Sequence, residues 1–172
     1  MTQLLRSLVQ IALLRRDPSV LPASAMLAAL LAVSYALTSA LQSWMLYGSD
    51  RIVWRTAVDL GLSLVLVWVV LMVMRRGHRF LQTISAVLGT SVLVAPIVVL
   101  LLLLMLGPAT TSYPAWLVAR AGAVLVTLWF VVVIGHILRG ALETGLVTGV
   151  VIALTWLMAS RMLAERLFPM AS

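Results

Sequence analysis

Two sets of charged side chains in this sequence could do chemistry, and the first lies inside apolar segments. Arg120 interrupts the apolar run AWLVARAGAVLV, and Asp59 lies a few residues into another apolar run. Charged residues within membrane-spanning segments usually face the interior of a bundle and pair with each other. We therefore predict an intramembrane pair of Asp59 with Arg120. Arg55, one helical turn before Asp59, is the alternative partner.

The depth of Arg120 decides what this pair would do. If its helix enters from the outer side at about Ala115, Arg120 lies roughly 7 Å below that end, level with Asp59. A charge this close to the surface can pair locally or extend toward the head groups. This placement favours a structural role for Asp59 and Arg120 over a substrate or proton site.

The second set, His136, Arg139 and Glu143, lies in the segment IGHILRGALETG around Gly140. Spacings of three and four residues allow Glu143 to pair with Arg139 or His136 at the head-group level. A metal site is not predicted, because no other ligand-spaced histidine or carboxylate exists and the chain has no cysteine. Phosphate-binding loops and nucleophile triads are also missing, so we expect no cofactor and no enzyme activity.

The composition identifies the kind of protein that must position these residues. Of 172 residues, 63% are hydrophobic and 10% are charged. Apolar runs longer than about 18 residues predict membrane-spanning helices. The predicted fold is all-α: one bundle of five transmembrane helices (17–172) after an amphipathic interfacial helix (1–16). The five spans are expected at about 21–42, 56–74, 80–106, 115–138 and 143–163.

Arginine positions predict the orientation. Placing the N-terminus inside assigns seven arginines to the cytoplasmic side (6, 15, 16, 75, 76, 79, 139) and four to the outer side (51, 55, 161, 166). An aromatic belt at the outer ends of the helices agrees. The basic charge is explained by topology and anionic lipid, not by nucleic acid. The absence of lysine and asparagine suggests a GC-rich genome, so we expect a multi-pass protein of a bacterial inner membrane with its C-terminus outside.

Small residues indicate close helix packing in the fifth span, where Gly145, Gly149 and Ala153 recur every fourth residue. Pro96 in the third span predicts a kink, because proline removes a helical hydrogen bond.

Two segments carry a resemblance to a known family. RFLQTISAVLGTSVLVAPIVVLL has a polar start, a glycine and a mid-helix proline, and WFVVVIGHILRGALETGLVTGVV has a histidine and glycines before a small-residue helix. Both resemble the Yip1 family of five-span membrane proteins. Eukaryotic members bind Rab-type GTPases and shape or sort transport membranes. The resemblance covers about half the chain. Where the eukaryotic members have a cytoplasmic N-terminal domain, we expect only a short amphipathic helix here.

The functional expectation is a non-enzymatic membrane protein that acts through lipids and through other membrane proteins or its own copies, organising a complex or the local membrane. The alternative is a component of a transporter or scramblase for lipid or a small solute. Its path would follow a polar seam formed by Gln82, Thr83, Ser85, Thr90 and Ser91 together with the Asp59–Arg120 pair.

Overall fold

The computed structural model describes residues 2–49, 52–106 and 113–167. Arg51, which the orientation argument uses, lies outside this part. The helices of the described chain are α1 (Thr2–Ala12), the 3-10 turn η1 (Pro18–Val20), α2 (Ala25–Tyr47), α3 (Ile52–Val73), the 3-10 turn η2 (Gly77–Arg79), α4 (Phe80–Leu106), α5 (Tyr113–Leu142) and α6 (Leu146–Leu167).

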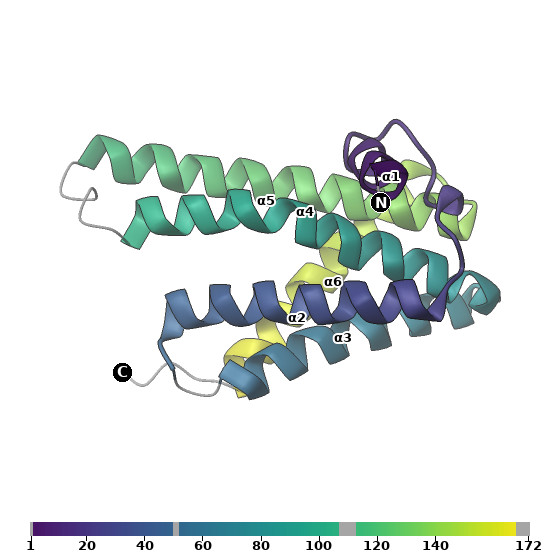
Figure 1. Ribbon diagram of the computed structural model, residues 1–172, viewed down its shortest axis with the longest axis horizontal. Helices are drawn as coiled ribbons and strands as arrows, with labels where there is room; N and C mark the ends of the chain where they lie inside the picture. Colours follow the sequence, from purple (N-terminus) through teal and green to yellow (C-terminus); the bar gives the residue numbers. More distant parts are fainter. Residues whose placement is uncertain (1, 50–51, 107–112, 168–172) are drawn as a thin grey trace.

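The long helices form two antiparallel pairs with a fifth helix crossing them (Figure 1). The first pair is α2 with α3 and the second is α4 with α5; α2 also packs closely against α4. The two pairs diverge toward the end of the bundle at which α2 ends and α5 begins (Figure 1). Helix α6 packs most extensively against α5 and then reaches α3.

The all-α architecture is confirmed, and four helices are long and apolar enough to cross a membrane: α2, α3, α4 with η2, and α5. The predicted third span, 80–106, coincides with α4 at both ends. Other boundaries shift by about one turn for local reasons. Helix α2 begins only after Ser24, whose Oγ accepts a hydrogen bond from the Leu27 amide at 3.3 Å, and it ends at Gly48 with φ of 73°. In α6 the apolar stretch is shorter, Leu146–Ser160.

The turn expected around Gly140 lies elsewhere. Helix α5 continues through Gly140 to Leu142, and the chain turns at Glu143, which has φ of 56°. The Thr144 amide closes the helix end by donating to the Arg139 carbonyl at 3.2 Å. The connection expected between the spans 115–138 and 143–163 is therefore found a few residues later, and the small size of Gly140 is used for a close contact between segments, described below.

Pro96 lies inside α4, and the helix remains continuous from Phe80 to Leu106. Figure 1 shows α4 changing direction along its length. A proline in a helix interior removes one backbone hydrogen bond and is a common cause of such a bend.

Helices α5 and α6 make a backbone-to-backbone contact between two glycines. A Cβ added to Gly149 would lie 2.1 Å from the carbonyl oxygen of Gly135, and one added to Gly135 would lie 2.8 Å from the Cα of Val150. Ala153, on the same face of α6, is 4% exposed. The packing predicted for Gly149 and Ala153 therefore exists. Gly145 takes no part in it, because it precedes α6 and a Cβ there would meet nothing within 4 Å.

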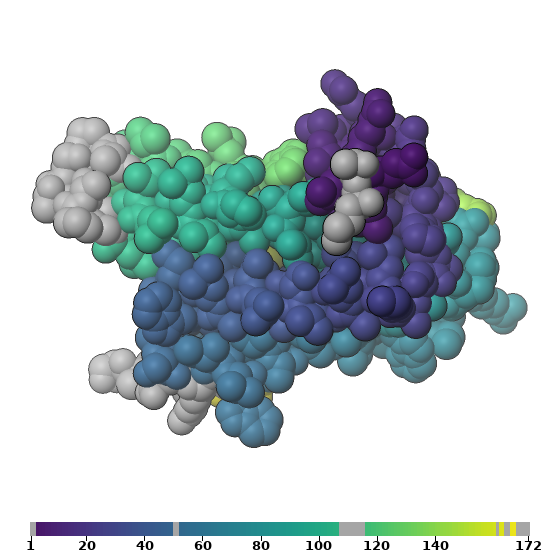
Figure 2. Space-filling view, in the orientation of Figure 1, coloured from purple at the N-terminus to yellow at the C-terminus, as the bar shows by residue number. Residues whose placement is uncertain are grey.

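Helix α1 is docked on the protein. Leu8, Ile11 and Ala12 belong to its buried face, with Leu8 2% and Ile11 0% exposed, and they pack mainly against α4. At the contact, a Cβ added to Gly89 would lie 2.6 Å from Leu8 Cδ2. The helix runs across the bundle and is seen end-on in Figure 1, while Figure 2 shows the purple N-terminal residues against the teal surface of α4. The expected amphipathic helix exists, but part of its apolar face binds protein, not lipid.

Candidate functional site

Asp59 is held by two hydroxyl groups from the neighbouring helix. Tyr35 Oη donates a hydrogen bond of 2.7 Å to Asp59 Oδ2, and Ser39 Oγ donates one of 2.9 Å to the same oxygen. Tyr35 and Ser39 are one turn apart on α2, so both face α3. Asp59 lies seven residues after the start of α3 at Ile52, roughly 10 Å along the helix, inside a candidate membrane span.

Arg120 has a different partner, so the predicted Asp59–Arg120 pair is corrected. The Arg120 guanidinium carbon lies 5.0 Å from the centre of the Trp116 ring, a cation–π contact within α5. Equal depth along two helices does not place them side by side: α3 packs against α2, α4 and α6, whereas α5 packs against α4 and α6. The alternative partner, Arg55, lies over the Tyr47 ring at 3.9 Å.

A cavity lined by both polar and apolar side chains lies beside Asp59, between the two helix pairs. Its volume is about 250 Å³. The polar side chains that line it come from four helices: Tyr35, Thr38, Ser39 and Gln42 of α2, Asp59 of α3, Ser91 of α4 and Thr127 of α5. A second cavity of about 150 Å³ shares Asp59, Tyr35 and Phe130 with the first and adds Trp156 of α6. Asp59 thus stands where two adjoining cavities meet.

The electrostatics of this cavity favour a cation. No basic side chain lines either cavity among the residues that the structure describes. A carboxylate away from water is costly unless a positive charge compensates it. The walls also carry the aromatic rings of Tyr35 and Phe130, whose faces attract organic cations. Within the described residues, no group of three or more His, Asp or Glu side chains could hold a metal ion.

Only one residue of the predicted polar seam on α4 faces this cavity, namely Ser91. Thr83 and Thr90 are buried and donate to carbonyls of their own helix, at 2.9 Å and 2.8 Å. Ser85 is also fully buried, and Gln82 Nε2 donates to the Leu21 carbonyl at 3.1 Å. The seam is therefore mostly a packing surface of α4. A hydroxyl that bonds to its own helix, as in Thr83 and Thr90, can be buried at little cost, whereas the buried Ser85 Oγ has no hydrogen-bond partner among the described residues.

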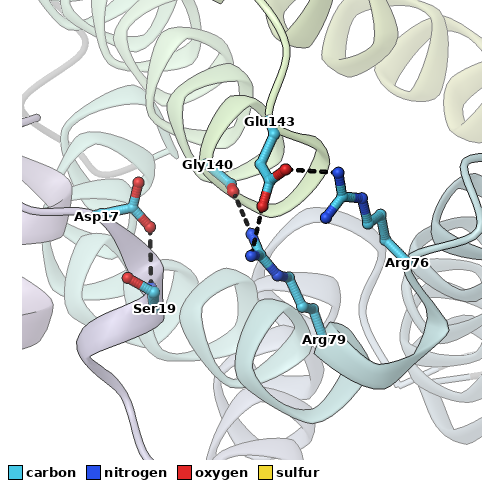
Figure 3. A network of polar contacts seen from close by, with 6 residues as sticks. All are labelled: Asp17, Ser19, Arg76, Arg79, Gly140 and Glu143. Atoms are coloured by element: carbon cyan, nitrogen blue, oxygen red, sulfur yellow. Dashed lines mark hydrogen bonds and ion pairs between the residues drawn. The ribbon is translucent and has the colours of Figure 1, made fainter.

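A charged cluster joins the helix ends at the opposite side of the bundle (Figure 3). Glu143 accepts from Arg76 Nη2 at 2.5 Å and from Arg79 Nη2 at 2.6 Å. Arg79 Nη1 also donates to the Gly140 carbonyl at 3.0 Å. These bonds connect the α3–α4 hairpin to the end of α5. The positive φ of Glu143 directs the chain toward the two arginines.

The predicted partners of Glu143 are therefore wrong. Arg139, one turn earlier on α5, is exposed. His136 is 7% exposed, and its Nε2 lies 3.0 Å from the carbonyl oxygen of Arg16. The His136 ring thus joins α5 to the segment that follows α1. Spacing along α5 predicted that Glu143 pairs with Arg139 or His136. At the end of α5, however, the chain directs Glu143 toward the α3–α4 hairpin.

The segment between α1 and α2 is fixed to α5 at Gly140. A Cβ added to Gly140 would lie 2.7 Å from Asp17 Oδ2 and 2.9 Å from Pro18 Cδ. Asp17 Oδ1 accepts from the Ser19 amide at 3.0 Å, which starts η1 (Figure 3). The absence of a side chain at Gly140 therefore lets this connection cross the helix directly.

Replacing Glu143 by glutamine is expected to destabilise the protein by about 0.5–2 kcal/mol, because two partly exposed ion pairs lose their charge. The loss should shrink at high salt, since salt screens exposed pairs. SDS-induced unfolding in mixed micelles measures it. Arg139→Gln is the matched control and should have little effect. If Arg139→Gln costs as much as Glu143→Gln, the cluster has been wrongly assigned.

Comparison with protein-family models, curated proteins and solved structures finds no match for this chain. The resemblance of its second half to the Yip1 family is therefore unsupported by these comparisons and stays a prediction.

Proposed function

We propose that this protein is a component of a membrane transport system that binds a small organic cation at Asp59. The observation that carries the proposal is a carboxylate within a candidate membrane span, facing a cavity of mixed polar and apolar lining that no described basic side chain lines. Asp59 would neutralise the positive charge of the solute, and Tyr35 and Phe130 would contact its alkyl groups. The cavity of about 250 Å³ is smaller than typical drug sites, which favours a small ammonium ion.

The proposed arrangement has five spans, with α6 as the fifth and the N-terminus in the cytoplasm of a bacterial cell. Asp59 would then lie in the outer half of the bilayer, on the side toward which the helix pairs diverge. Five spans without an internal inverted repeat make a small transporter, so we propose that it works as an oligomer or with a partner protein.

The test uses the purified protein in liposomes and radiolabelled tetraethylammonium as the probe. Asp59→Asn keeps an oxygen that can accept from Tyr35 and Ser39 but removes the charge. We expect binding and uptake to fall by about tenfold or more, the effect of losing the attraction between the carboxylate and the cation. Asp17→Asn, at the other end of the bundle, is the control and should retain both binding and uptake of tetraethylammonium. Equal binding by Asp59→Asn and the parent would reject the proposal.

The second candidate is the non-enzymatic role in organising membrane or protein complexes through lipids and partner proteins. The observation that favours it is the docked α1, whose polar side chains surround an open groove. Purification from native membrane would distinguish the candidates. Specific co-purifying proteins without uptake activity support organisation, whereas uptake by the isolated protein supports transport.

A further inference from the structure

Helix α1 has three faces, and only one of them binds the bundle. Its buried face carries Leu8 and Ile11. A second, apolar face remains exposed, with Leu5 at 53%, Val9 at 44% and Leu13, just beyond the helix, at 52%. The third face is polar and includes Gln3, Arg6, Ser7 and Gln10. A helix with an exposed apolar face beside a polar face lies at a membrane surface.

The polar face forms one wall of a groove of about 620 Å³, and the segment that follows α1 forms the other. The groove is lined by Gln3, Leu4, Arg6, Ser7, Gln10, Arg16, Val20, Leu21 and Pro22. Two guanidinium groups, of Arg6 and Arg16, contribute to it, and none of these lining residues is acidic. The groove therefore presents positive charge beside apolar surface.

The second wall is held in place by bonds to the bundle. His136 Nε2 lies 3.0 Å from the Arg16 carbonyl, and Gln82 Nε2 donates to the Leu21 carbonyl at 3.1 Å. The nearby acid, Asp17, is directed toward the Ser19 amide and Gly140. Since the walls are fixed, a ligand would not have to order them, and this favours binding.

A polar atom in the same groove lacks a partner. Gln10 Oε1 is buried and accepts no hydrogen bond within the protein. An unsatisfied buried acceptor costs about 1–3 kcal/mol. Because this oxygen is shielded from solvent, a ligand hydroxyl can satisfy it only when the Gln10 amide rotates toward the groove. Arginines that bind phosphate, beside an acceptor for a hydroxyl, match the head group of a phosphatidylglycerol-like lipid.

We infer that this groove is a binding site for an anionic phospholipid, with the phosphate at Arg6 and Arg16 and an acyl chain along Leu5, Val9 and Leu13. The lipid occupies the angle between α1 and the connection to α2, and so holds the docked helix at the membrane surface. The inference is independent of the proposed cation site, because no residue is shared between the two.

Native mass spectrometry of the full chain in maltoside micelles tests the inference. Dioleoyl-phosphatidylglycerol and dioleoyl-phosphatidylcholine are titrated separately, and bound lipid is counted. The parent protein should bind phosphatidylglycerol at least tenfold more tightly than phosphatidylcholine. Arg6→Gln with Arg16→Gln should lose about tenfold or more of that affinity, because two charge-assisted contacts are removed. The charge-matched control is Arg15→Gln with Arg139→Gln, which leaves the groove intact and should bind like the parent.

Three outcomes would overturn the inference. The first is an equal loss of phosphatidylglycerol affinity in the groove variant and in its control, which would mean that the lipid is held by nonspecific charge attraction. The second is equal binding of both lipids by the parent. The third is displacement of phosphatidylglycerol by millimolar inorganic phosphate, which would identify a free-phosphate site in place of a lipid site. Circular dichroism of both double variants confirms that they are folded before binding is compared.

Discussion

Replacing Gly149 by alanine is expected to destabilise the bundle by about 3 kcal/mol or more, although alanine is the better helix former. The added Cβ would lie 2.1 Å from the Gly135 carbonyl oxygen and 3.1 Å from the Arg139 amide nitrogen. Both are backbone atoms of α5, so no side-chain rotation can relieve the clash, and α6 must move away as a whole. SDS-induced unfolding in mixed micelles should show the loss.

The matched control is Gly61→Ala in α3, where an added Cβ meets nothing within 4 Å. That change should stabilise the protein by about 0.5–1 kcal/mol, because glycine loses more backbone entropy in a helix than alanine. If glycine-to-alanine lowers the stability at position 149 and raises it at position 61, the loss at 149 comes from the α5–α6 contact and not from helix propensity. A Gly149→Ala protein as stable as the parent would show that α5 and α6 are not in backbone contact.

The same substitution also reports on the cavity at Asp59. Helix α6 supplies Leu157 to the main cavity and Trp156 to the adjoining one. These side chains lie about two turns beyond Gly149, so a shift of α6 away from α5 at Gly149 should move them as well. We expect Gly149→Ala to weaken tetraethylammonium binding as well as stability, whereas Gly61→Ala should leave binding unchanged.

The sequence was sufficient to predict the helices because their length and apolarity are local properties. The predicted span 80–106 matches α4 at both ends, and the helix predicted within 1–16 is found as α1 (Thr2–Ala12). Gly149 and Ala153 were also found from their spacing. The partner of Gly149 was not predicted. Gly135 is an isolated glycine on α5, and its importance is seen only when the crossing point of α5 and α6 is known.

The candidate site was predicted in part. Asp59 was identified because a lone acid in an apolar run is costly. Its partners were missed, although α2 carries a polar stripe, Tyr35, Thr38, Ser39 and Gln42, at the spacing of one helix face. That stripe was a usable signal: a polar face inside an apolar helix must meet polar groups of another helix. Arg76 and Arg79 were counted only as topology signals, so their pairing with Glu143 was not expected.

The lipid groove depends on the docking of α1 against the bundle, because α1 forms one of its walls. Leu8→Ala should weaken docking by about 1–3 kcal/mol, because it leaves a cavity against Gly89. The chain has no cysteine, so Ile11→Cys, at a position that is 0% exposed, gives a single reporter thiol. Adding Leu8→Ala to this reporter should speed maleimide labelling roughly 5- to 150-fold, since labelling requires α1 to undock.

Leu5→Ala in the same reporter protein, labelled in detergent without added phospholipid, is the control, because Leu5 is 53% exposed on the same helix and the substitution removes the same atoms as Leu8→Ala. Its labelling rate should stay within about threefold of the reporter alone, the variation typical of exposed substitutions. Phosphatidylglycerol should slow labelling of the reporter, and Arg6→Gln with Arg16→Gln should abolish that protection while leaving labelling without lipid unchanged. Rapid labelling of the unmodified reporter would show instead that α1 is undocked in the membrane, and the groove could then not be a lipid site.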